Sequence, residues 1–213
     1  MTSALQALAD LREGNQRFVD SRERDATKSD AARRRALVQG QAPRAIILGC
    51  SDSRVPAEII FDQGLGDLFV IRVAGNIVAP SQVGSVEFAA DRFGTRLVVV
   101  LGHSHCGAVA ATLSTLANEQ APPSSNLRSI VDRIRPHIHA LWEGSSACDP
   151  DALMQEAVRA NIRASVDHLK HGSAILENLG RESGLLVVGA EYDLESGVVD
   201  FFEGLPSDAP MTG

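Results

Sequence analysis

Four short stretches of the chain are continuously apolar, and they constrain the fold more than any other feature of the sequence. They are residues 45–48, 68–71, 97–101 and 185–188. An apolar run of this length without alternating polar residues is typical of a strand that is buried on both faces of a sheet. Stretches with the apolar spacing of helices lie between the runs. The sequence therefore predicts an α/β fold with a mostly parallel sheet.

Helical spacing also flanks these runs, and a fifth strand follows them. Helical patterns cover residues 5–18, 56–60, 82–93, 106–116, 126–141 and 151–179. The stretch 197–203 has the composition of a strand and follows the turn-rich segment 193–197. A connection this short joins antiparallel neighbours only. We therefore expect a four-stranded parallel sheet with an antiparallel fifth strand, flanked by helices and preceded by an N-terminal helical arm.

The beginning of the chain differs in composition from the remainder. Residues 20–36 are rich in charged side chains and nearly free of large apolar ones, so they cannot form a core of their own. We interpret residues 1–40 as an N-terminal helical arm that embraces a partner subunit in a dimer. Residues 41–213 are expected to form a single α/β domain.

Composition and charge exclude several classes of protein. Apolar residues make up 44% of the chain and charged residues 22%, which are values of an ordinary globular protein rather than a disordered one. No apolar run approaches the roughly 18 residues of a membrane span, and no secretory signal is visible. The net charge of −7 argues against non-specific nucleic-acid binding. Only three cysteines are present, which favours a reducing, cytoplasmic location.

Two polar clusters follow predicted strands. One contains Cys50, Asp52 and Arg54, and the other contains His103 and Cys106. Functional groups of open parallel sheets collect at the carboxyl ends of the strands, so these clusters are expected to meet. Two Cys and one His match a catalytic zinc site, which keeps three protein ligands and a fourth position for water. Asp52 can fill the fourth position in a closed state, or pair with Arg54 and accept a hydrogen bond from bound water.

Other interpretations of these residues carry less weight. A single buried Cys is usually a small hydrophobic residue, so the metal hypothesis depends on the grouping of Cys50, His103 and Cys106. Cys148 has no partner in its loop and is interpreted as a bystander, whereas His105 is given a structural or supporting role. A cysteine phosphatase would need an Arg six residues after Cys106, where this chain has Thr112.

The two motifs together identify a family resemblance. The pattern Cys50-x-Asp52-x-Arg54, followed by His103-x-x-Cys106, resembles the β-class carbonic anhydrases. Further matching segments occur in the family's order at residues 14–18, 56–58, 67–72, 74–76, 84–88 and 107–109. The resemblance implies Zn²⁺ held by the two Cys and the His, and reversible hydration of CO₂ to bicarbonate and a proton by zinc-bound hydroxide. Asp52 and Arg54 would be the catalytic pair, and residues 41–213 would form a single α/β zinc-binding catalytic domain.

The resemblance also implies a substrate cleft and an assembly. The residues that match the cleft are Gln41, which would donate a hydrogen bond to substrate, and the apolar residues Phe69, Val73 and Phe88. Phe88 stands where many members have Tyr. The family implies a homodimer or a dimer of dimers with its active sites at the subunit interface, acting on CO₂ and bicarbonate.

One departure from the family pattern concerns regulation. Some members hold bicarbonate in a non-catalytic pocket made by a Trp, an Arg and a Tyr, and their Asp then binds zinc. Arg72 and Tyr192 match two of these positions, but the Trp position is Ile47, and the only Trp of the chain is Trp142. We therefore expect bicarbonate-linked closure to be weak or absent, with Asp52 paired to Arg54 at alkaline pH.

Two alternatives remain from the sequence alone. The same zinc site on the same fold would hydrolyse carbonyl sulfide or carbon disulfide in a chain with a different access path. A non-catalytic module that binds zinc and bicarbonate is the other alternative. The presence of both Asp52 and Arg54 argues against such a module, because neither is needed to hold zinc.

Overall fold

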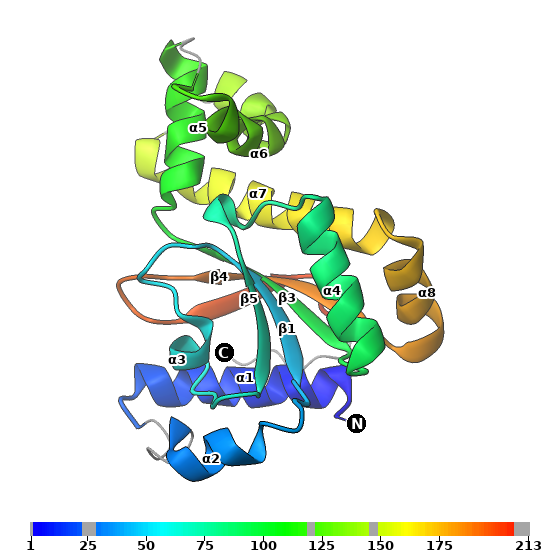
Figure 1. Ribbon diagram of the computed structural model, residues 1–213. Helices are drawn as coiled ribbons and strands as arrows, with labels where there is room; N and C mark the ends of the chain where they lie inside the picture. The colour runs from blue at the N-terminus through cyan, green and yellow to red at the C-terminus, as the bar shows by residue number, and fades with distance from the viewer. Residues whose placement is uncertain (1, 23–28, 119–121, 145–148, 207–213) are drawn as a thin grey trace.

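A five-stranded mixed sheet forms the centre of the molecule (Figure 1). The computed structural model describes residues 2–22, 29–118, 122–144 and 149–206. The strand order is β2-β1-β3-β4-β5, and the strands are β1 (Ala45–Gly49), β2 (Leu68–Arg72), β3 (Leu97–His103), β4 (Leu186–Tyr192) and β5 (Val199–Glu203). The first four are parallel and β5 is antiparallel to β4. The predicted fold class is confirmed.

The position of a strand in the sheet decides how deeply it is buried. Every residue of β1 and β3 is buried, as the continuous apolar runs predict. In β2 only Leu68 is buried, and the other four residues are partly or fully exposed. The prediction of burial on both faces is therefore wrong for β2, because this strand lies at the edge of the sheet and has a neighbour on one side only.

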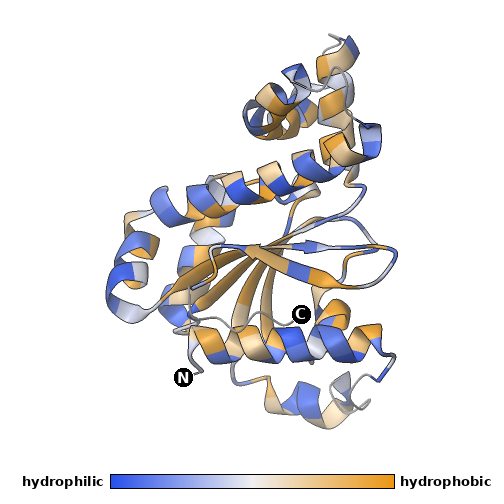
Figure 2. Cartoon of the chain, turned by 180° about the vertical axis from the view of Figure 1, so that it is seen from behind, coloured by the Kyte–Doolittle hydropathy of each residue, from blue (hydrophilic) through white to orange (hydrophobic). Residues whose placement is uncertain are grey.

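Helices cover both faces of the sheet. They are α1 (Ala4–Val19), α2 (Ala31–Ala36), α3 (Ala57–Ile60), η2 (Ala74–Asn76), α4 (Pro80–Arg92), α5 (Gly107–Asn118), α6 (Ser125–Glu143), α7 (Pro150–His171) and α8 (Ala174–Ser183). Because successive strand residues point to opposite faces, two cores form. One joins Ile46 and Leu48 to α4–α8, and the other joins Ile47 to α1 and α3. Figure 2 shows the strands as mostly hydrophobic, and α5 and α6 project beyond α7 (Figure 1).

The N-terminal segment contributes to the core of its own chain. Helix α1 starts at the N-cap Ser3 and buries Leu8 and Leu11 against the sheet. Helix α2 buries no residue, and Arg33 from it forms an ion pair with Asp67. The division of the chain at residue 40, and the contact of the N-terminal arm with a partner subunit, stay predictions.

Two boundaries differ from the sequence prediction. The helical pattern of residues 151–179 is interrupted, because Ser173 caps α8 and a Cβ on Gly172 would lie 2.5 Å from the His168 carbonyl oxygen. Strand β4 continues past Gly189 to Tyr192. Gly189 permits this because α7 packs so closely there that a Cβ would lie 2.7 Å from the Ile162 side chain. Within the described ranges, no helix has the length and apolar character that a membrane span requires.

Candidate active site

The ends of two neighbouring strands bring the predicted metal ligands together. Cys50 follows β1, His103 ends β3, and Cys106 directly precedes α5. Strands β1 and β3 are parallel neighbours, so their carboxyl ends lie at the same edge of the sheet. The ligand atoms of the three residues all lie within 4.8 Å of one another, and all three residues are buried.

The orientation of His103 leaves one ring nitrogen available inside this cluster. Its Nδ1 lies 2.9 Å from the Ser104 carbonyl oxygen, which fixes the ring. Its Nε2 is buried and has no hydrogen-bond partner among the described residues. A buried, unpaired ring nitrogen is costly unless another group satisfies it. Together with the Cys50 and Cys106 thiols, it is a donor set that fits zinc.

The two thiols influence each other's protonation. The hydrogen bond from Cys106 is the largest influence on Cys50, and with His103 it outweighs burial and lowers the pKa of Cys50 to about 4. The same hydrogen bond, together with burial, raises the pKa of Cys106. For His103, burial acts to lower the pKa, but the neighbouring Cys50 thiolate and the hydrogen bond with the Ser104 carbonyl raise it overall. The cluster thus favours one thiolate, which is the form of Cys that binds metals.

Backbone contacts hold the segment that carries Cys50. The Gly75 N–H donates to Cys50 Sγ over 3.4 Å. Arg72 donates from Nε to the Cys50 carbonyl oxygen over 2.9 Å, and its guanidinium also donates to the Asp52 carbonyl oxygen. Arg72 therefore supports the main chain on both sides of Ser51.

Asp52 and Arg54 form a bidentate ion pair beside the metal-ligand cluster. Arg54 donates from Nε to Oδ1 over 2.9 Å and from Nη2 to Oδ2 over 2.8 Å, and its backbone N–H donates to Oδ1 over 3.0 Å. The pKa of Asp52 is held well below its usual range, chiefly by the side-chain hydrogen bonds from Arg54. Asp52 Oδ2 lies 3.8 Å from His103 Nε2, so an ionised carboxylate faces the ligand atoms.

Of the four predicted substrate residues, Val73 lies at the same edge of the sheet as Cys50 of its own chain. Val73 follows β2, and its N–H donates to the Gly49 carbonyl oxygen, beside Cys50. Gln41 precedes β1, whereas Cys50 follows it; at about 3.3 Å per residue, the five residues of β1 separate them by roughly 16 Å. Phe69 lies three positions before the end of β2. The single chain therefore does not place Gln41 and Phe69 beside Cys50.

Phe69 and Phe88 belong to an aromatic cluster at the sheet edge. Their ring centroids are 6.3 Å apart, and Phe93 lies 6.0 Å from Phe69 and 5.6 Å from Phe88. Phe88 projects from α4 and is 54% exposed. A large aromatic side chain that is half-exposed beside two others is typical of an interaction surface.

The other residues named in the sequence analysis differ in burial: some lie in the core and others at the surface. Ile47 is fully buried in the core beneath α1, and Tyr192 pairs in register with His103 and is also buried. Trp142 lies in α6, where its ring is 6.3 Å from that of His139. His105 is exposed and has a positive φ of 54°. Cys148 lies outside the described residues.

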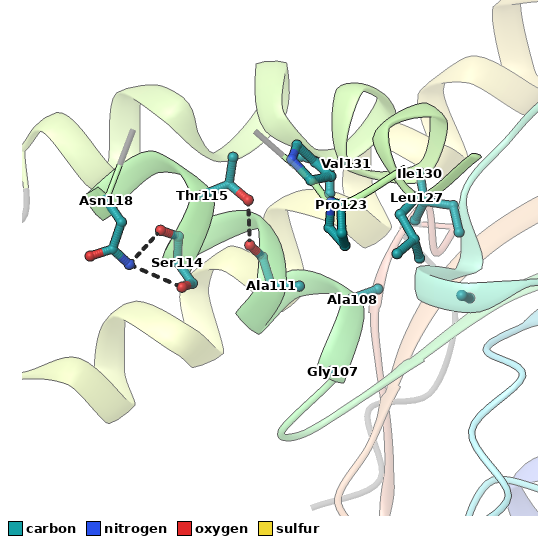
Figure 3. A pocket seen from close by; sticks show the side chains of 12 residues that line it. Gly107, Ala108, Ala111, Ser114, Thr115, Asn118, Pro123, Leu127, Ile130 and Val131 are labelled. Atoms are coloured by element: carbon teal, nitrogen blue, oxygen red, sulfur yellow. Dashed lines mark hydrogen bonds between the residues drawn. The ribbon is translucent and has the colours of Figure 1, made fainter. Parts of the chain in front are cut away.

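Sequence reasoning missed a groove that begins next to the ligands. It has a volume of about 480 Å³ and lies mainly between α5 and α6 (Figure 3). Its lining includes Ala74 and Gly107, the chain neighbours of Gly75 and Cys106, and is otherwise mainly apolar along Ala108, Ile130 and Val131. Its polar lining residues Ser114, Thr115 and Asn118 lie in helix α5, whose small and apolar residues give a core-like pattern, so nothing in the sequence marked a groove there.

Comparisons with known proteins agree with this geometry. The carbonic anhydrase family matches residues 45–199. A carbonic anhydrase of Mycolicibacterium smegmatis is 48% identical over 192 residues, covering 89% of each chain, and carbonic anhydrase 2 of Mycobacterium tuberculosis is 39% identical over 196 residues, covering 92% of this chain and 91% of the relative.

Solved structures give the same result. The β-carbonic anhydrase CafA of Aspergillus fumigatus superposes with a TM-score of 0.74 at 25% identity, covering 95% of this chain and 92% of that one. One of two tetrameric β-carbonic anhydrases of Sordaria macrospora gives a TM-score of 0.72 at 26% identity, covering 79% and 84%. The matched family, these relatives and the Cys-His-Cys cluster identify the chain as an enzyme of the β-class carbonic anhydrase family.

Proposed function

We propose that the chain catalyses the reversible hydration of CO₂ with one Zn²⁺ held by Cys50, His103 and Cys106. The observation that carries this proposal is the convergence of their three ligand atoms within 4.8 Å of one another, beside the ionised carboxylate of Asp52. Bound Zn²⁺ lowers the pKa of a water molecule and so supplies the nucleophile for hydration. With two thiolate ligands that offset the charge of the metal, we expect activity to rise with pH.

We assign to Asp52, held by Arg54, the role of accepting a hydrogen bond from the attacking nucleophile. Three hydrogen bonds from Arg54 keep the Asp52 carboxylate ionised and turned toward Arg54, which favours a free fourth position at the metal over a closed site. The side of Oδ2 that faces His103 Nε2 then remains able to accept a hydrogen bond from the attacking nucleophile. Asp52 thereby orients the nucleophile, and Arg54 holds Asp52.

A second copy of the chain is needed to complete the substrate cleft. Gln41 and Phe69 lie toward the opposite end of β1 and β2 from Cys50, and Phe88 is half-exposed, so we place these residues in the site of a partner subunit. Val73 lines the site of its own chain. The Sordaria macrospora proteins are described as tetrameric, which supports a homodimer or a dimer of dimers. We also place the enzyme in the cytoplasm, as its few cysteines favour.

The deciding experiment combines metal content with turnover. Purified protein is expected to contain one zinc per chain, and stopped-flow CO₂ hydration is expected to rise between pH 6.5 and 9. Cys106→Ser should lose both zinc and turnover, whereas Cys148→Ser, a matched change at the third cysteine, should keep both. A zinc-loaded wild-type protein whose rate equals that of buffer at every pH would refute the proposal, and carbonyl sulfide would be the next substrate to test.

A further inference from the structure

The short helix η2 makes an unusual contact with the metal-ligand cluster. Its Gly75 is in the left-handed region, with φ 68° and ψ 21°, and its N–H donates to Cys50 Sγ. A Cβ on Gly75 would lie 2.9 Å from both the Ala108 and the Ile134 side chains. The main chain of Gly75 therefore packs tightly in one conformation, and this conformation aims its N–H at the sulfur.

Two side chains of α7 hold this turn from behind. Asn161 Nδ2 donates to the Gly75 carbonyl oxygen over 2.8 Å, and Ser165 Oγ donates to the Asn76 carbonyl oxygen over 3.1 Å. Both side chains belong to buried residues, and they are four positions apart, so they share one face of the helix. Their hydrogen bonds go to the turn rather than to a predicted ligand, and each holds a carbonyl that follows the Gly75 N–H along η2.

The placement of α7 is itself set by the strand that carries His103. A Cβ on Gly102 would lie 2.5 Å from Ile162 Cδ1, so this glycine lets α7 approach β3 one residue before His103. Ile162 stands next to Asn161 along the helix. The same turn of α7 is thus fixed against the strand of one metal ligand and against the turn that contacts another.

We propose that Asn161 and Ser165 are positioning residues for the metal centre, acting through the Gly75 N–H on the Cys50 sulfur. The proposal rests on the zinc site described under the proposed function. A hydrogen bond to a thiolate withdraws charge from the sulfur and fixes its direction, and partners of this kind alter how a ligand binds its metal. Asn161 and Ser165 thereby govern how strongly Cys50 donates charge to the metal.

The test uses two variants and two matched controls in the full-length protein. Ser165→Ala and Asn161→Leu each remove one support of η2. Ser173→Ala removes a buried serine that donates to Glu87, and Asn15→Leu removes a buried asparagine that donates to the carbonyl oxygens of Ile60 and Gly197, both on parts of the fold away from η2.

Two readouts are independent of turnover. In Co²⁺-substituted protein, the thiolate-to-metal charge-transfer band of both α7 variants should move to longer wavelength, because the sulfur that loses its hydrogen bond gives up charge more easily. Competition with a chelator should show zinc affinity about tenfold weaker or more, because Cys50 Sγ is no longer held in one direction and this loss outweighs its stronger donation. The pH midpoint of CO₂ hydration should also rise, since a more strongly donating thiolate makes the metal less acidifying. Both controls should leave the band unshifted even where they lower thermal stability.

The outcomes separate this inference from the assignment of the site. A band that is unchanged in Ser165→Ala, in folded protein that binds Co²⁺ normally, would overturn the positioning role and leave the zinc site intact. Equal shifts in the controls would also overturn it, because a general loosening of the fold would then explain them. Wild-type protein without any thiolate-to-Co²⁺ band would refute both the metal site and the inference. Ser165→Ala removes only one hydroxyl, so the test does not depend on whether Asn161→Leu folds.

Discussion

Replacing Asp52 by Asn tests the assigned chemistry with the smallest change in shape. The carboxylate accepts three hydrogen bonds from Arg54, two on Oδ1 and one on Oδ2. An amide has a single acceptor oxygen, so the variant keeps at most two of the three bonds and turns an NH₂ group toward a donor. It also removes the negative charge that lies 3.8 Å from His103 Nε2.

The two expected magnitudes differ, and this difference makes the test sharp. Losing a group that accepts or orients a proton in the reaction costs about 10²- to 10⁴-fold in rate, or about 3–5 kcal/mol. The Asp52–Arg54 pair is a surface pair in which the Arg54 side chain is 54% exposed, so its removal should cost only about 0–1 kcal/mol of folding stability. Asp52→Asn should therefore lose turnover while keeping its melting temperature and zinc content.

Stopped-flow CO₂ hydration, metal analysis and thermal unfolding on one preparation give the answer. The matched control is Asp67→Asn, because Asp67 also pairs with an arginine, Arg33, but on the surface between α2 and β2. This control should keep full turnover. Zinc-loaded Asp52→Asn with a rate within about threefold of wild type would refute the role assigned to Asp52.

Three further predictions concern pH, the core and closure of the site. Hydrogen bonds from the backbone N–H of Ser196, and then from its hydroxyl, lower the pKa of Asp193. The ionised Asp193 therefore stabilises the fold above about pH 4, and this stabilisation is lost as the pH falls further. The melting temperature of Asp193→Asn should lie below that of wild type by an amount that shrinks toward about pH 3, and a constant difference would contradict this. Leu11→Ala should lower the free energy of unfolding by about 2–5 kcal/mol in urea titrations, because the side chain is fully buried against the sheet; a loss under 1 kcal/mol would mean that α1 is not part of the core. Because the Trp of the family's bicarbonate pocket is missing, a crystal grown above pH 8 with bicarbonate should keep Asp52 on Arg54, and Asp52 on zinc would overturn that expectation.

Much of the sheet was predictable because most of its strands coincide with uninterrupted apolar runs in the sequence. β1 and β3 are central, so nothing polar is tolerated in their first residues, and the polar residues resume where each strand leaves the core. This abrupt change also marked Cys50 and His103 as neighbours. The end of β4 was missed because Gly189 and the buried Glu191 interrupt the apolar run; Glu191 is accommodated by an ion pair with Arg159 of α7, a long-range contact.

The supporting parts of the site could not be predicted from local pattern. Asn161 and Ser165 lie in a helix whose periodicity indicates only amphipathic packing, and their partners are 86 and 89 residues away in the sequence. The family resemblance assigned Gln41 to the substrate cleft, although the strand predicted at residues 45–48 already separates it from Cys50, and nothing local in the sequence showed how the two could share a cleft. Such contacts depend on tertiary geometry rather than on neighbouring residues.

The side chain of Asn15 joins the first helix to a part of the chain that is synthesised almost last. This residue of α1 accepts a hydrogen bond from the Val199 N–H and donates to the Gly197 carbonyl oxygen, across 184 and 182 positions of sequence. At a translation rate of 5–20 residues per second, α1 must wait roughly 10–40 s on the ribosome before these partners exist. Its apolar face packs against α3, β1 and β3, which are synthesised much earlier, so α1 can cover that face well before the two hydrogen bonds of Asn15 form.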